Sequence, residues 1–209
     1  MAGHGTLPDI QVLWPKRLIK EWPSGHSYLY ERNVMRIIDQ RSWDAVDFVM
    51  HLHEMGVRRG AEIGVLQGDM SSKLTRVIPD LHMILVDPWL HVEGYDDIAN
   101  TSQLIQDCRY NLVKALMPQH TIIRKTSIEA AKEVEDGSLD FVYIDAEHTL
   151  EAVLQDIEAW HPKLKPNGVL AGHDFSTSYL TVVQAVCDTA IKWDRSLIIY
   201  QRDDIWRMV

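Results

Sequence analysis

The chain has 209 residues, 46% of them hydrophobic, and a formal net charge of −9 at pH 7. This length and composition suffice for one α/β domain that buries about 70% of the surface of its unfolded chain. The acidic balance and the scattered lysines and arginines argue against nucleic acid as a partner, because a phosphate backbone requires a concentrated basic surface.

No apolar run approaches the roughly 18 residues of a membrane span, and the first ten residues lack the charged and apolar parts of a signal peptide. We therefore expect a soluble, cytoplasmic protein without a membrane partner. Cys108 and Cys187 lie far apart and form no C-x-x-C motif, so neither a disulfide framework nor a zinc ribbon is predicted. Both cysteines are expected to be small buried apolar groups.

Residues 1–41 have mixed periodicity, three prolines and several aromatic residues, and we interpret them as an irregular N-terminal arm or lid. Its aromatic side chains either line a lid over a substrate or pack on the domain or on a partner subunit. Residues 42–209 are predicted to form one domain. Its first helix would be capped by Ser42 and continue to about Met55, where Gly56 ends it.

A glycine-containing turn follows the first predicted strand of this domain. The apolar run from Ala61 to Val65 carries Glu62 and leads into a loop with Gly64 and Gly68, after which a helix begins. Glycine permits tight turns and close approach of a ligand, and a helix start offers free N–H groups, so the pattern indicates a small-molecule cradle. An ordinary βα turn is the alternative. The spacing does not match the G-x-G-x-x-G fingerprint of dinucleotide-binding proteins.

The second predicted strand, His82 to Asp87, ends in an acid. Asp87 follows Gly68 by 19 residues, close to the distance at which an acid in a βαβ unit reaches the hydroxyls of a ribose. The alternative is a loop or cap residue before Pro88. The position at the strand end favours ribose binding.

Polar residues follow two later strands. Leu139 to Ile144 is almost continuously apolar, as expected of a strand covered on both faces, and Asp145 and His148 follow it closely. The next strand ends at His173 and Asp174. Because open α/β sheets bind ligands at the carboxyl ends of their strands, these side chains are expected to converge there.

The converging residues suggest metal chemistry. The imidazole of His173 and the carboxylates of Asp145 and Asp174 form a set that can hold a divalent ion with open positions for substrate oxygens. The histidine favours manganese, iron or zinc over magnesium, which prefers oxygen ligands. The alternative is a site without metal in which His173 and His148 are ordinary hydrogen-bonded residues.

Five motifs in a fixed order, closed by a terminal hairpin of 197–200 and 205–209, carry a family resemblance. They are GAEIGVLQGDMS, LVDPW, KTSIEAA, GSLDFVYIDAEH and WHPKLKPNGVLAGHDF. The ordered set resembles the class I S-adenosylmethionine-dependent methyltransferases, especially the small-molecule and sugar O-methyltransferases, a group that includes cephalosporin hydroxylase-like proteins. The resemblance covers about residues 42–209. It implies a Rossmann-like, doubly wound α/β fold whose sheet has seven strands, the last of them antiparallel.

The resemblance also implies a cofactor site for S-adenosylmethionine. The methionine part would lie among Glu62, Gly64 and Gly68, the ribose hydroxyls on Asp87, the adenine near Trp89 and Ser127, and the methyl-bearing end beside Asp145. In metal-dependent relatives an acid at the Asp145 position and an acidic pair after the fifth strand bind a divalent ion. Here Asp174 matches, whereas His173 stands where relatives often have glutamate, and Phe175 where another branch has asparagine.

The function expected from these residues is methyl transfer from S-adenosylmethionine to an oxygen of a small molecule, a sugar or glycoside hydroxyl by resemblance. The catalytic group would comprise His148 as first candidate base, His173 as second, and Asp145 beside the methyl group, unless a metal activates the hydroxyl instead. The alternatives are a metal-dependent oxygenase with Asp145, His173 and Asp174 on iron, and a non-catalytic cofactor-binding protein. The sequence leaves the acceptor and the oligomeric state open, a homo-oligomer included.

Overall fold

The structure, a computed structural model, describes residues 37–40, 43–93 and 99–209; the expected N-terminal arm lies outside the described residues except for 37–40. The strands are β1 (Ile37–Gln40), β2 (Arg59–Ile63), β3 (His82–Val86), β4 (Thr121–Ile123), β5 (Leu139–Ile144), β6 (Leu164–Gly172), β7 (Leu197–Tyr200) and β8 (Ile205–Met208). The helices are α1 (Ala45–Glu54), α2 (Asp69–Val77), α3 (Gln103–Leu116), α4 (Ser127–Ala131), α5 (Leu150–Trp160) and α6 (Leu180–Lys192), with short 3-10 turns at His161–Lys163 and Gln201–Asp203.

All described strands belong to one sheet in the order β1-β7-β8-β6-β5-β2-β3-β4. Every neighbouring pair is parallel except those of β8, which runs antiparallel to both β6 and β7. The strands from β2 to β8 reproduce the predicted seven-stranded sheet with an antiparallel last strand, so that prediction is confirmed. β1 adds an eighth strand at the edge, parallel to β7, from the end of the segment interpreted as an arm.

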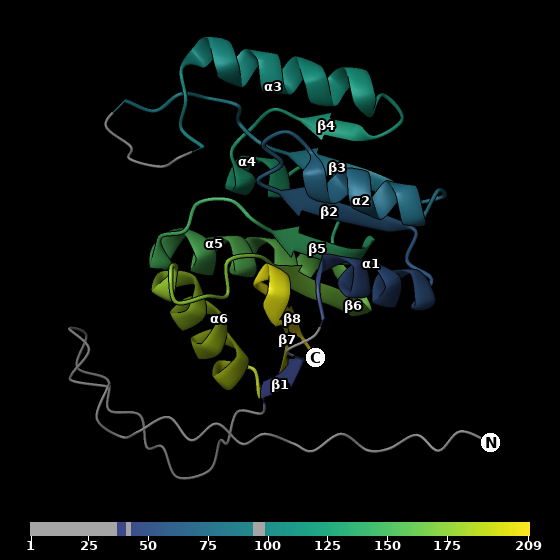
Figure 1. The fold of residues 1–209 in the computed structure, drawn as a ribbon, viewed down its shortest axis with the longest axis vertical. Helices are drawn as coiled ribbons and strands as arrows, with labels where there is room; N and C mark the ends of the chain where they lie inside the picture. The colour runs from purple at the N-terminus through teal and green to yellow at the C-terminus, as the bar shows by residue number, and fades with distance from the viewer. Residues whose placement is uncertain (1–36, 41–42, 94–98) are drawn as a thin grey trace.

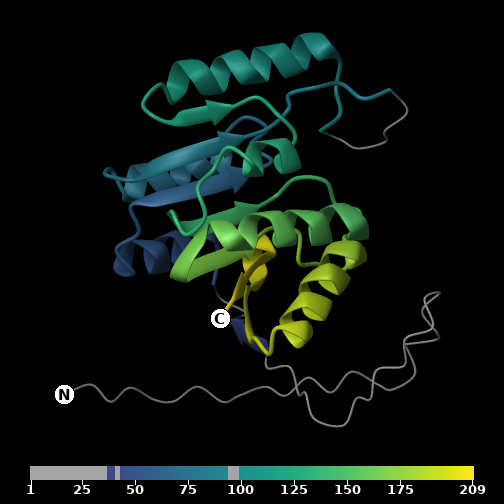
Figure 2. The ribbon, with the colours of Figure 1, turned by 180° about the vertical axis from the view of Figure 1, so that it is seen from behind.

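Helices cover both faces of the sheet, as a doubly wound fold requires (Figures 1 and 2). The alternation of β5 divides its side chains between two buried clusters. Phe141 and Tyr143 pack on the face that α1, α2 and α3 cover, and Val142 and Ile144 pack on the face of α4, α5 and α6. The uninterrupted apolar run of β5 thus reflects burial on both sides, which confirms its predicted place in mid-sheet.

Asp140, the polar exception in this run, lies at the amino end of β5, away from the ligand-binding edge. Its carboxylate accepts hydrogen bonds from the backbone N–H groups of Arg58 and Arg59, both at 2.8 Å, and from Lys165 Nζ at 2.6 Å. Burial would raise the pKa of this carboxyl, but these hydrogen bonds and the Lys165 charge outweigh it and lower the pKa. Asp140 therefore joins the starts of β2, β5 and β6 and has a structural role.

Several element boundaries differ from the predictions. The first helix begins at Ala45, because Asp44 caps it through the N–H groups of Val46 and Asp47. The predicted cap, Ser42, lies outside the described residues. It ends before Gly56, which has a φ of +72°, as predicted.

Two later segments also differ. β6 begins at Leu164, earlier than predicted, because its register with β5 shifts and the irregular part accommodates Pro166. Cys108 was expected to be buried and is exposed on α3, whereas Cys187 is buried. No helix among the described residues combines the length and the apolar character that crossing a membrane would require.

Candidate functional site

The loops that follow β2, β3, β5 and β6 meet at the carboxyl ends of the parallel strands. They hold most of the residues selected from the sequence. The loop after β2 contains Gly64 with a φ of +87° and Gly68 with a φ of +86°, both in the left-handed region. A Cβ atom on Gly64 would lie 1.9 Å from the carbonyl oxygen of Asp145, and one on Gly68 would lie 2.9 Å from Met117 Cε. The positive φ favours glycine at both positions, and the close backbone of Asp145 also requires it at Gly64.

Glu62 lies beneath this loop, and its side chain is buried. Its Oε2 accepts a hydrogen bond from the backbone N–H of Ser71 at 3.1 Å and another from the Ser71 hydroxyl. Burial raises the pKa of Glu62 to about 8, against the opposing effect of the Ser71 hydroxyl. The carboxyl is therefore mostly protonated at neutral pH.

Asp87 ties the end of β3 to the loop after β2. Its Oδ2 accepts from the N–H groups of Val65 and Leu66, at 3.1 and 2.9 Å, and its Oδ1 accepts from Trp89 N–H at 2.6 Å. Burial raises the pKa of Asp87, although these backbone hydrogen bonds oppose the shift. A carboxylate has about four acceptor positions, so three backbone donors leave capacity for a ligand hydroxyl.

Trp89 and Ser127 are engaged within the protein. The indole of Trp89 is fully buried, lies against Tyr110 with ring centroids 5.2 Å apart, and donates from Nε1 to the carbonyl oxygen of Leu66 at 2.7 Å. It supports the loop from inside and offers no exposed ring face to an adenine. Ser127 begins α4, and its hydroxyl accepts from Trp160 Nε1 at 2.9 Å. The adenine contacts of both residues remain predictions.

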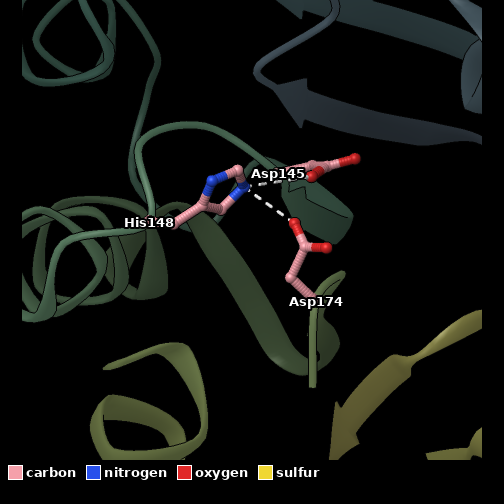
Figure 3. A group of neighbouring side chains, drawn as sticks. All are labelled: Asp145, His148 and Asp174. Atoms are coloured by element: carbon pink, nitrogen blue, oxygen red, sulfur yellow. Dashed lines mark ion pairs between the residues drawn. The ribbon is translucent and has the colours of Figure 1, made fainter. Parts of the chain in front are cut away.

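Beyond β5 and β6, two carboxylates and a histidine converge, as Figure 3 shows. His148 Nε2 lies 2.7 Å from Asp174 Oδ2 and 4.0 Å from Asp145 Oδ1, and the three side chains offer ligand atoms within 4.8 Å of one another. We call Asp145, His148 and Asp174 the acid–histidine cluster. His173 borders it, with Nδ1 3.2 Å from Asp174 Oδ1 and 3.7 Å from Asp145 Oδ1.

The charges within the cluster depend on one another. Burial would lower the pKa of His148, but the carboxylates of Asp174 and Asp145 outweigh this and raise it to about 10. The pKa of His173 is raised in the same way, against its burial. Burial would raise the pKa of Asp174, but the two histidines hold it well below its usual range. The two carboxylates therefore favour the protonated form of His148 at neutral pH.

The predicted metal set was Asp145, His173 and Asp174, and the structure brings these three side chains together. The group whose ligand atoms all lie within 4.8 Å of one another contains His148 in place of His173. Sequence reasoning assigned His148 only a role as base, although its spacing of three residues from Asp145 was a signal for convergence. Two carboxylates with one or two imidazoles fit manganese, iron or zinc better than magnesium. Tyr179, which sequence reasoning missed, lies against the imidazole of His148 with ring centroids 4.5 Å apart. Only its nearness in sequence to Asp174 could have suggested it.

Comparison with known proteins decides the family. Residues 61–175, more than half of the chain, match the family model described as a methyltransferase domain. The chain belongs to this methyltransferase family. The resemblance inferred from the ordered motifs is thereby confirmed.

Solved structures agree on the fold. A Staphylococcus aureus protein described as a caffeoyl-CoA O-methyltransferase has a TM-score of 0.57 and 19% identity over 78% of this chain and 81% of its own. The O-methyltransferase NovP has a TM-score of 0.57 and 16% identity over 78% and 76%. The methyltransferase PaMTH1 of Podospora anserina, solved with S-adenosylhomocysteine bound, has a TM-score of 0.51 and 10% identity over 78% and 76%. At these identities the similarity establishes the methyltransferase fold.

A curated relative matches a shorter segment. An uncharacterized protein of Sinorhizobium fredii (strain NBRC 101917 / NGR234), y4gI, is 42% identical over 53 residues. The matched segment is 25% of this chain but only 6% of the relative, so the match adds nothing about activity.

Proposed function

We propose that this methyltransferase uses S-adenosylmethionine to methylate an oxygen of a small molecule, with a sugar or glycoside hydroxyl as the expected acceptor. The observation that carries the proposal is that the loop after β2, Glu62 in β2, Asp87 after β3 and the acid–histidine cluster meet at the carboxyl ends of the parallel strands. The O-methyltransferases among the structural neighbours support oxygen as the acceptor atom.

The residues of the loop region fit the proposed cofactor. S-adenosylmethionine supplies an electrophilic methyl group on a positively charged sulfur. Glu62 would bind its amino group once the carboxyl loses its proton, and Asp87 would accept a hydrogen bond from a ribose hydroxyl. The hydroxyl of Tyr143, the cross-strand neighbour of Glu62, is buried and has no hydrogen-bond partner among the described residues. Such a buried donor indicates a further polar group, from a ligand or an ordered water, in the complete site.

The acid–histidine cluster would deprotonate the acceptor hydroxyl. The carboxylates of Asp145 and Asp174 hold a proton on His148, so the imidazole becomes a base only when positive charge near these carboxylates lowers its pKa. A divalent ion held by Asp145, Asp174 and His148 or His173 would lower the pKa of the acceptor hydroxyl directly. Base catalysis of this kind contributes roughly 10²–10⁴-fold to a rate.

A metal-dependent oxygenase on the same fold is the second candidate. Two imidazoles with one carboxylate form the ligand set of many non-haem iron oxygenases, and both His148 and His173 lie beside Asp174. This function requires tightly bound iron and a product that contains oxygen from O₂.

Calorimetry and product analysis test the proposal together. Chelator-treated protein is titrated with S-adenosylmethionine and S-adenosylhomocysteine, with and without manganese or magnesium, and then incubated with a panel of sugars and glycosides. We expect micromolar binding of both cofactor forms, at least about tenfold weaker in Asp87→Asn, and acceptor masses raised by one methylene group. Absence of cofactor binding would overturn the proposal. Oxygen-dependent products with iron would favour the second candidate.

Glu62 gives a pH-dependent prediction for stability. Because its pKa is raised to about 8 in the folded protein, the folded state binds a proton more tightly than the unfolded state. The resulting stabilisation is complete below the unfolded pKa of 4.5 and is lost as pH rises through the folded pKa. Its full size is roughly 5 kcal/mol. Urea unfolding of the wild type and of Glu62→Gln at about pH 5 and about pH 8.5 measures how much stability each protein loses between the two pH values. The loss should be clearly smaller in Glu62→Gln than in the wild type; equal losses would contradict the prediction.

A further inference from the structure

Helix α3 exposes an apolar face to solvent. Its buried residues are Gln106 and Val113, which face the protein. On the other side the exposed fractions are 74% for Leu104, 46% for Ile105, 46% for Leu112 and 62% for Leu116. Figures 1 and 2 both show α3 at the outer end of the molecule, beside the edge strand β4, with one side turned away from the sheet.

The exposed apolar residues form a continuous stripe. At 100° per residue they occupy an arc of about 120° that contains no charged side chain. We call this group the α3 stripe; its members are Leu104, Ile105, Cys108, Leu112, Ala115 and Leu116. Scattered exposed leucines are ordinary, whereas a contiguous apolar surface of this kind marks an interaction site.

The positions in the α3 stripe are symmetric about residue 110. Leu104 corresponds to Leu116, Ile105 to Ala115 and Cys108 to Leu112. A second α3 packed antiparallel across a two-fold axis near residue 110 would therefore place every apolar side chain against another apolar side chain. Four members follow one another at a spacing of four residues, and such ridges interlock in the commonest class of helix packing.

The charges on α3 also fit a second copy. A net charge of −9 repels two copies, so a stable contact has to lie where charged groups are absent. The three charged residues of α3 are engaged within their own subunit. Asp107 pairs with Arg124 at 2.5 Å, Arg109 donates to the carbonyl oxygen of Ala99 at 2.8 Å, and Lys114 Nζ lies 6.0 Å from the ring centroid of Tyr110. Apposed stripes would bury no unpaired charge.

We propose that the α3 stripe is a self-association surface, through which two copies of this chain form a two-fold symmetric dimer. The contact surrounds the midpoint of α3 and joins the stripes antiparallel. Since the segment after β3 is tied to the start of α3, with His91 N–H donating to Gln103 Oε1 at 3.0 Å, the partner would also border the loop that leads toward the cofactor site.

Oligomeric state tests the proposal. Sedimentation equilibrium of the full chain should show a dimer at about 10 µM, and Leu112→Glu should raise the dimer dissociation constant at least about 100-fold, because each subunit would bury an unpaired carboxylate. Val46→Glu is the matched control, since Val46 is 61% exposed on α1 and outside the stripe. Circular dichroism should show both variants folded, and the control should stay dimeric.

Cys108 provides a second readout near the proposed axis. A short bismaleimide should cross-link the wild-type chain at Cys108 and leave Cys108→Ser monomeric on a denaturing gel, because Cys187 is buried. A monomeric wild type, or an unchanged dimer in Leu112→Glu, would overturn the proposal. A dimer that dissociates only when residues 1–36 are deleted would also overturn the proposal. The same holds if the chain is monomeric and binds neutral lipid vesicles through the α3 stripe.

Discussion

Replacing His148 with alanine is expected to lower methyl-transfer turnover by about 10²–10⁴-fold while the affinity for S-adenosylmethionine stays nearly unchanged. The imidazole lies 2.7 Å from Asp174, and the loop after β2 is held by Asp87 and by the Trp89 indole. Loss of the imidazole should therefore remove a proton acceptor and spare the cofactor loop. Steady-state rates with the acceptor found by product analysis, together with calorimetric titration of the cofactor, check this expectation.

Two controls sharpen this test. His53→Ala removes an exposed histidine on α1 and should leave both quantities unchanged. Asp174→Asn removes a charge that holds the proton on His148, so the pKa of His148 should fall toward its ordinary value, which NMR titration of the imidazole measures. Equal losses of turnover and cofactor affinity in His148→Ala would show that the residue maintains the site rather than transferring a proton.

Replacing Gly64 with alanine is expected to lower the free energy of unfolding by more than about 3 kcal/mol and to abolish cofactor binding. The backbone at this position has a φ of +87°, and the new Cβ would lie 1.9 Å from the carbonyl oxygen of Asp145. Relief of that clash requires the loop after β2 and the end of β5 to separate. Both halves of the site, the cofactor loop and the acid–histidine cluster, would then move.

Gly137→Ala separates the conformational cost of a positive φ from the cost of the steric clash with Asp145. Gly137 also has a positive φ, +66°, but a Cβ atom there would meet nothing within 4 Å. It should therefore show only the conformational cost of the left-handed region, about 1–2 kcal/mol. Urea unfolding of both variants measures the difference. A cost for Gly64→Ala no larger than that for Gly137→Ala would refute the role of close approach.

Local patterns in the sequence were sufficient for most of the fold. The apolar run of β5 predicted burial on both faces of the sheet, and the terminal hairpin predicted the antiparallel last strand. Acids that end parallel strands share one edge of a sheet, which is why the convergence of Asp145 and Asp174 could be predicted. These features depend on the hydrophobic periodicity and on the direction of successive strands, and both can be recognised in short segments of consecutive residues.

Only the tertiary structure determined the features that depend on contacts between residues far apart in the sequence. The short strand β1 exists through its pairing with β7, far along the sequence, and has no period of its own to detect. Loop path and side-chain rotamers place His148 nearer to Asp174 and His173 nearer to Asp145. Trp89 is buried because the loop after β2 folds over it. The exposure of the α3 stripe was hidden for the same reason: the sequence shows that a helix has apolar residues, but only packing determines which of them the sheet covers.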